Sequence, residues 1–134
     1  MLRKLLSPTL RLIAAVQFAL GLAFALAPEA SAQALGLAPA PGWANWLLGM
    51  LAARCLAFGY GMWWAARHPA QARLWIGSMV FVQAVDWLVT LKYLALGAVT
   101  LAQVSTASFL PVVFMLVLGL GMPPVAAAPQ ADAP

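Results

Sequence analysis

Charged residues are scarce in this chain: they make up 7% of its 134 residues, and only three of them are acidic. A soluble domain devotes about a quarter of its residues to charge, because its surface must face water. A chain so poor in charge, with 65% hydrophobic residues, cannot cover such a surface. The composition therefore excludes a soluble globular domain and favours a protein embedded in lipid.

Residues suited to catalytic, redox or metal chemistry are equally few. Cys55 is the only cysteine, so no disulfide can form within the chain, and its apolar surroundings in the sequence suit a small hydrophobic residue. His68 is the only histidine, and no second metal ligand lies near it in sequence. Asp86 is the only carboxylate in a long apolar run, so no carboxylate pair is available for acid–base catalysis. We therefore expect no cofactor, no metal site and no enzymatic activity.

Long hydrophobic runs dominate what remains. Each has about the 17–25 residues that a helix needs to cross roughly 30 Å of hydrocarbon. Helices are predicted because a backbone inside lipid must satisfy its own hydrogen bonds. The runs cover residues 10–27, 44–66, 74–94 and 104–122. The sequence thus predicts an all-α membrane protein with a bundle of four transmembrane helices.

The predicted helices form one domain over residues 1–122, followed by a tail over 123–134 that is rich in alanine and proline. Such a tail cannot bury enough apolar surface to offset its ordering entropy, so we expect it to be disordered. Within the last run, Pro111 lacks a backbone donor and leaves the carbonyl of Ala107 unpaired, which predicts a kink.

The first predicted helix also has the features of a signal peptide. A basic start and an apolar run precede Ala30-Ser31-Ala32, which matches a cleavage site. The apolar run is long for such a segment, so we expect the first helix to be retained.

The basic residues predict the orientation of the chain in the membrane. The net charge is +4, but the positive residues form no stripe that would suit nucleic acid. They cluster before or at the start of the first helix and between the second and third, at Arg3, Lys4, Arg11, Arg67 and Arg73. The positive-inside rule then places both termini in the cytoplasm.

Aromatic and basic residues near the ends of the predicted helices suit the two membrane interfaces. Rings with one polar edge favour the headgroup region, and a long lysine side chain can reach it. The predicted interfacial anchors are Trp43, Trp46, Trp63, Trp64, Trp75, Lys92 and Tyr93.

Polar residues near the middle of the second and third helices are the candidates for function. Arg54 and Asp86 are expected at similar depths on antiparallel neighbours, where each unpaired charge would cost about 2.5–3.5 kcal/mol. Gln83, Asp86 and Thr90 fall within one arc of the third helix. We favour an ion pair that clamps the two helices; a site for a proton or a polar ligand is the alternative.

Small residues repeat at every fourth position of the second helix, at Gly49, Ala53, Ala57 and Gly61. Such a stripe lets membrane helices approach closely, so it predicts a helix–helix contact.

The stretches FALAPEASAQALGL and LLGMLAARCLAFGYGMWWAARHP resemble small four-helix bacterial membrane proteins, including DoxX-like and uncharacterised families. The shared features are Pro-Glu after the first helix, then Leu35-Gly36, then a second helix with small residues and arginine, and an aspartate in the third. The resemblance implies a four-helix bundle in the bacterial inner membrane, with Arg54 and Asp86 as its polar pair. It implies no particular activity.

Two classes of function follow from this reading. In the first, the chain is a non-catalytic accessory, structural or assembly subunit, whose partners are the bilayer and other membrane subunits or further copies of itself. In the second, it is a small transporter or proton-coupled carrier that uses Arg54 and Asp86. Lipid or quinone binding between the helices is a third possibility.

The orientation yields the first prediction. With both termini in the cytoplasm, alkaline phosphatase fused to the C-terminus should be inactive, and a fluorescent protein fused at the same position should fluoresce. Phosphatase activity in the C-terminal fusion would contradict the predicted topology.

Overall fold

The chain is helical over most of the residues that the computed structural model describes, which are 2–38 and 41–124, and these residues contain no strand. The helices and one 3₁₀ turn are α1 (Leu2–Leu26), α2 (Pro28–Ala34), α3 (Gly42–Arg67), α4 (Arg73–Ala95), α5 (Leu101–Val104), η1 (Ser105–Ser108) and α6 (Leu110–Gly121). The predicted all-α class is therefore confirmed. Most of the predicted tail lies outside the described residues.

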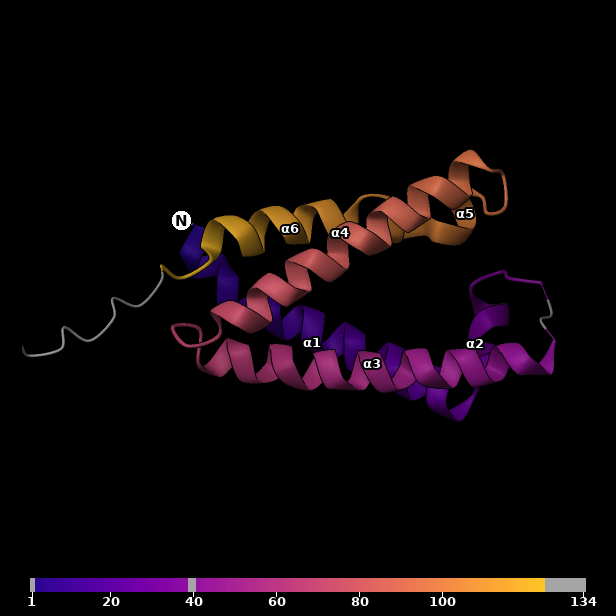
Figure 1. Cartoon of the computed structure of the whole chain (residues 1–134), viewed down its shortest axis with the longest axis horizontal. Helices are drawn as coiled ribbons and strands as arrows, with labels where there is room; N and C mark the ends of the chain where they lie inside the picture. Colours follow the sequence, from indigo (N-terminus) through magenta and orange to yellow (C-terminus); the bar gives the residue numbers. More distant parts are fainter. Residues whose placement is uncertain (1, 39–40, 125–134) are drawn as a thin grey trace, which may run out of the picture.

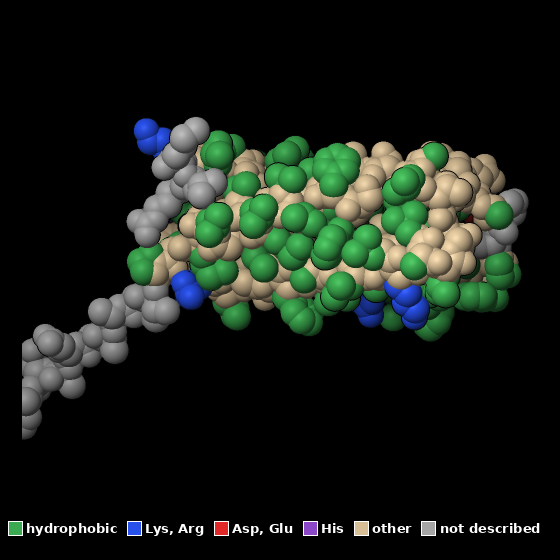
Figure 2. All heavy atoms as spheres, turned by 90° about the horizontal axis from the view of Figure 1, so that it is seen from above, with side chains coloured by type: hydrophobic (Ala, Val, Ile, Leu, Met, Phe, Trp, Pro, Cys, Tyr) green, Lys and Arg blue, Asp and Glu red, His purple; other side chains and the backbone are tan. Residues whose placement is uncertain are grey.

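Three helical segments of the described residues are long and apolar enough to cross a membrane: Lys4–Leu26, Arg73–Ala95 and Leu101–Gly121. Only 17–28% of the residues in these segments are buried within the protein. Figure 2 shows hydrophobic side chains along the length of one face, interrupted by few basic ones. So much exposed apolar surface requires a lipid environment, which supports the prediction of a membrane protein.

The second predicted helix corresponds to α3, whose 26 residues are long enough to cross the hydrocarbon. It is not among the three apolar segments. Arg54 near its middle, together with several glycines and tryptophans, lowers its mean hydropathy below that of the three apolar segments.

The long helices are arranged as two pairs that meet at one end. α1 packs along α3, α4 packs along α6, and α1 also contacts α6. Figure 1 shows the two pairs diverging towards the end that carries α2 and α5. α3 and α4 meet near their connecting turn, where the rings of Phe58 and Trp75 lie edge to face at 6.5 Å. α3 and α4 are therefore not neighbours along their length. The prediction of antiparallel neighbours, which rested on the short turn between them, is wrong.

Glycines allow the close approach of α1 to α3. A Cβ at Gly21 would lie 2.8 Å from the side chain of Leu56 and 3.2 Å from the carbonyl oxygen of Ala52. A Cβ at Gly59 would lie 3.0 Å from the ring of Phe18. Both distances are shorter than a comfortable van der Waals contact, so these positions leave no room for a larger side chain.

Most of the predicted small-residue stripe of α3 lies outside the contact with α1. Gly49, Ala53 and Ala57 are exposed, and only Gly61 is buried, beneath the indole of Trp75. The difference arises because large apolar side chains of α1 select the opposing face of α3. That face presents Ala52, Cys55, Gly59 and Met62, which are all buried.

The hydrophobic core lies at the end where the two helix pairs meet. It combines the first half of α1, the last turns of α3, the first turns of α4 and the last turns of α6. Its largest fully buried side chains are Leu10, Ile13, Met62, Ile76, Met79 and Leu118.

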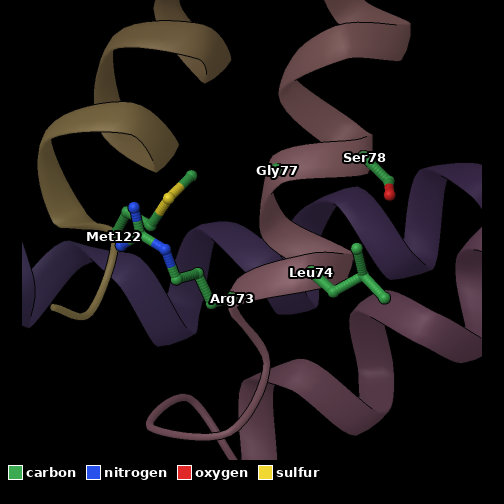
Figure 3. Close-up of a pocket in the computed structure, with 5 residues that line it drawn as sticks. All are labelled: Arg73, Leu74, Gly77, Ser78 and Met122. Carbon is green, nitrogen blue, oxygen red and sulfur yellow. The ribbon is translucent and has the colours of Figure 1, made fainter. Parts of the chain in front are cut away.

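Polar contacts close the same end of the molecule. The hydroxyl of Ser7 donates to the carbonyl oxygen of Ala66 at 2.9 Å, which joins α1 to α3. The Arg73 guanidinium donates to the carbonyl oxygen of Pro123, and Figure 3 shows its side chain beside Met122 at the end of α6. These bonds tie the start of α4 to the end of α6 and the start of α1 to the end of α3.

The last apolar run contains a break instead of the predicted kink. α5 ends at Val104, the turn η1 follows, and α6 begins at Leu110. Ser105 adopts a φ of 45°, a value that residues other than glycine rarely take. Pro111 lies in the first turn of α6, where its missing N–H would have no helical partner in any case. Proline therefore starts a helix here and does not bend one.

The contact at Gly61 generates a second prediction. In Gly61→Ala the new Cβ would overlap the Trp75 indole, so the free energy of unfolding in detergent should fall by about 1–3 kcal/mol. Gly49→Ala is the matched control, because no atom lies within 4 Å of that position. Equal stability of the two variants, measured by thermal unfolding, would contradict the described contact.

Candidate functional site

A cavity of about 190 Å³ lies between α1, α4 and the broken segment before α6. We call it the polar cavity. Its walls are Val16, Gln17, Leu20, Gln83, Asp86, Thr90, Thr106, Ala107, Leu110, Pro111 and Phe114. Gln83, Pro111 and Phe114 are buried, whereas Val16, Leu20, Asp86, Thr106 and Ala107 are exposed. The cavity therefore runs from a rim at the protein surface to a buried floor.

Three elements supply the polar groups of the cavity. Gln17 comes from α1, Thr106 from η1, and Gln83, Asp86 and Thr90 come from α4. Positions 83, 86 and 90 share one side of α4 because their spacing of three and four follows the helical repeat. The predicted arc of Gln83, Asp86 and Thr90 thus lines one site.

Most of these polar groups lack a protein partner among the described residues. The Gln83 side chain is 8% exposed, and its only hydrogen bond runs from Nε2 to the sulfur of Met79 at 3.5 Å. The Thr90 hydroxyl donates to the backbone carbonyl of Asp86 at 2.8 Å. Gln17, Thr106 and the Asp86 carboxylate form no side-chain hydrogen bond within the described residues. The cavity thus presents unused acceptors and donors.

Arg54 does not join this site. It is exposed on α3, and the described residues contain no ion pair between Arg54 and Asp86. The two residues do share a depth: Arg54 precedes Arg67 by 13 residues, and Asp86 follows Arg73 by 13. At 1.5 Å per residue, each lies about 20 Å along its helix from the connecting turn. The predicted clamp is absent because α3 packs on α1 while α4 packs on α6.

Arg54 instead shares the outer side of α3 with the small-residue stripe. Gly49, Ala53 and Ala57 are exposed on the turns around it. We call these four residues the outer face of α3. A cation in the middle of a long helix, flanked by small residues, is unusual for a surface that faces lipid alone.

The interfacial candidates lie at both ends of the long helices. Trp43 and Trp46 are exposed in the first turns of α3. At the opposite end, the Arg67 guanidinium lies 4.6 Å from the ring centre of Trp63, and Trp64 stacks on His68 at 4.9 Å. Trp75 covers Gly61, so this ring also serves internal packing. Lys92 lies over Tyr93 near the end of α4.

Two contributors to the site were not predicted from the sequence. Thr106 belonged to the predicted last helix, and Trp87 was the one tryptophan without an interfacial position. The Trp87 indole donates to the carbonyl oxygen of Ser108 at 2.8 Å, which holds η1 against α4. The polar residues shortly before Pro111 were the sequence signal that could have predicted the helix break at η1.

The described residues contain no group of three or more His, Cys, Asp or Glu side chains that could hold a metal ion. No family model, curated protein or solved structure matches this chain. The resemblance to DoxX-like proteins therefore stays a prediction.

The separation of Arg54 from Asp86 generates a third prediction. Because the two side chains share no contact, the effects of Arg54→Gln and Asp86→Asn on the free energy of unfolding should add within about 0.3–0.5 kcal/mol. The measurement is a double-mutant cycle on monomeric protein in dilute detergent. A coupling free energy of several kcal/mol, as expected for a buried ion pair, would show instead that Arg54 and Asp86 form the predicted ion pair.

Proposed function

We propose that this chain is a non-catalytic accessory or assembly subunit that joins a larger complex in the bacterial inner membrane. It crosses the membrane four times, with α3 as the fourth spanning helix and both termini in the cytoplasm. The outer face of α3 is the surface that meets its partner.

Several features support α3 as a spanning helix. Its 26 residues extend about 39 Å, which exceeds the roughly 30 Å of hydrocarbon. It packs along α1, which is itself long and apolar enough to span. Tryptophans occur in its first and last turns, as expected at the two interfaces. α3 therefore spans the bilayer alongside α1, although its mean hydropathy is lower than that of the three apolar segments.

Arg54 is the observation that carries the proposed role. An exposed arginine at the middle of a spanning helix costs about 2.5–3.5 kcal/mol if it faces lipid alone. The stripe of Gly49, Ala53 and Ala57 leaves a second helix room to approach the Arg54 backbone. The chemistry that fits this surface is a transmembrane helix that carries a carboxylate at the same depth.

The fourth prediction tests this surface directly. A photo-crosslinking residue in place of Ala57 should capture a distinct membrane protein with a carboxylate in one of its spans. Arg54→Gln and Ala53→Leu should each reduce the crosslinked yield at least several-fold, because one removes the charge and the other fills the stripe. Ala19→Leu, at an exposed position of α1, is the matched control and should keep the yield.

Two outcomes would overturn the proposal. If the crosslinked yield is unchanged by Arg54→Gln, the charge does not select the partner. If the captured protein is a second copy of this chain, the surface serves self-association and not an accessory role. Crosslinking is performed in native membranes before detergent is added, so that weak complexes are retained.

A specific observation also favours ligand binding as a second candidate function. The polar cavity offers unpartnered side chains from three elements, whereas the Arg54–Asp86 pair that the carrier hypothesis used is not formed. A carrier or binding role would therefore use the cavity with Asp86 and without Arg54.

A further inference from the structure

The polar cavity contains more hydrogen-bonding capacity than the protein itself uses. Gln83 is nine-tenths buried and faces the cavity with only a thioether as partner. Among the described residues no inaccessible side-chain nitrogen or oxygen lacks a hydrogen-bond partner. The Gln83 amide oxygen, which forms no bond within the protein, is therefore accessible from the cavity and can accept a hydrogen bond from a ligand there. Gln17, Asp86 and Thr106 direct further polar groups to the same space from α1, α4 and η1.

The broken helix places backbone as well as side chains at the cavity. Thr106 and Ala107, in η1, line it directly. Irregular backbone in a membrane segment is tolerated where it is covered by protein or borders a polar cavity. Broken spanning helices also supply ligand sites in transporters. The interruption between α5 and α6 therefore forms part of the cavity wall and is not a loop at the membrane surface.

The charge of the lining determines the kind of ligand. Asp86 is the only charged residue of the cavity wall, and no basic residue lines it. The amides of Gln17 and Gln83 and the hydroxyl of Thr106 add acceptors around that carboxylate. A cation that donates several hydrogen bonds complements this arrangement. A divalent metal does not, because Ca²⁺ takes six to eight oxygen ligands and one carboxylate leaves it under-neutralised.

The apolar part of the wall determines the rest of the ligand. Val16, Leu20, Leu110, Pro111 and Phe114 complete the lining. The volume of about 190 Å³ equals that of roughly six water molecules at about 30 Å³ each. A compact apolar group fits against these side chains while a cationic group meets Asp86 at the rim.

We propose that the polar cavity binds a small primary ammonium compound with one compact apolar substituent. The ammonium group donates to the Asp86 carboxylate and to the Gln83 and Gln17 amide oxygens. The apolar substituent lies against Phe114 and Leu110. The exposed rim at Val16 and Leu20 admits the ligand from the bilayer, where an amphiphilic amine accumulates. This site is separate from the outer face of α3 and does not depend on the accessory role.

The fifth prediction uses benzylammonium as the probe, with the full chain in lipid nanodiscs and empty nanodiscs as background. Benzylammonium should bind saturably and raise the unfolding temperature. Benzyl alcohol, which lacks the charge, and benzyltrimethylammonium, which lacks N–H donors, should each bind at least about ten-fold more weakly, a factor equivalent to about 1.4 kcal/mol. These comparisons use the unaltered protein, so they hold whatever the variants do.

Variants then locate the site. Asp86→Asn and Gln83→Met should each lower the affinity for benzylammonium about ten-fold or more. Glu29→Gln is the matched control: its carboxylate lies on α2, accepts a hydrogen bond from Asn45 at 2.9 Å and is outside the cavity. Thr106→Val at the exposed rim should give a smaller loss and is the fallback if a change on α4 prevents folding.

Several results would overturn the proposal. Equal binding of benzyl alcohol would mean that the cavity recognises apolar groups only. Equal binding of benzyltrimethylammonium would mean that hydrogen-bond donation has no role. Competition by Na⁺ at the same site, with no selectivity among the organic probes, would identify a metal-ion site. An unchanged affinity in Asp86→Asn that folds normally would place the ligand elsewhere.

Discussion

The close contact between α1 and α3 determines how the other helices are arranged. Glycine at positions 21 and 59 lets the two helices approach until side chains of one touch the backbone region of the other. Dispersion contacts grow steeply at such distances, so this pairing is favoured over a looser one. α6 packs on a second side of α1, and α4 packs on α6. A second pair of helices results, set at an angle to the first.

The divergence of the two pairs explains where both candidate surfaces lie. Because α4 leaves α3 soon after the turn, Asp86 is carried towards α1 and α6, where the polar cavity forms. The same divergence leaves Arg54 on α3 without the carboxylate at its own depth. Two opposite charges that the sequence places at matching positions therefore face different surroundings. One belongs to a cavity within the chain and the other to a surface that suits a neighbour.

The length of the hydrophobic runs and the cost of unpaired backbone in lipid were enough to predict an all-α chain with helical segments of membrane-spanning length. They did not predict α2 or the break between α5 and α6. The arc of Gln83, Asp86 and Thr90 also followed from helical geometry, since all three lie on one helix. The pairing of helices did not follow. A short turn limits the distance between two helix ends, but it does not fix the angle at which they leave the turn. Gly61 and Trp75 hold α3 and α4 together only at that end. Pro111 showed a related ambiguity, because proline both bends helices and starts them.

The uneven distribution of the core along the helices has a dynamic consequence. The main cluster of buried apolar side chains and the Ser7 and Arg73 bonds lie near one end, whereas Phe24, Ala52 and Cys55 are buried further along α1 and α3. At the other end, the Gln103 side chain donates a hydrogen bond to the carbonyl oxygen of Gly36, which joins the two helix pairs. We therefore expect the free energy of local opening to decrease along α4 and α6, away from the core, and less so along α1 and α3, which stay closely packed at Gly21. The two pairs share one packed base, so we expect any change in the width of the polar cavity to come from their diverging ends, where the Gln103–Gly36 hydrogen bond would have to open.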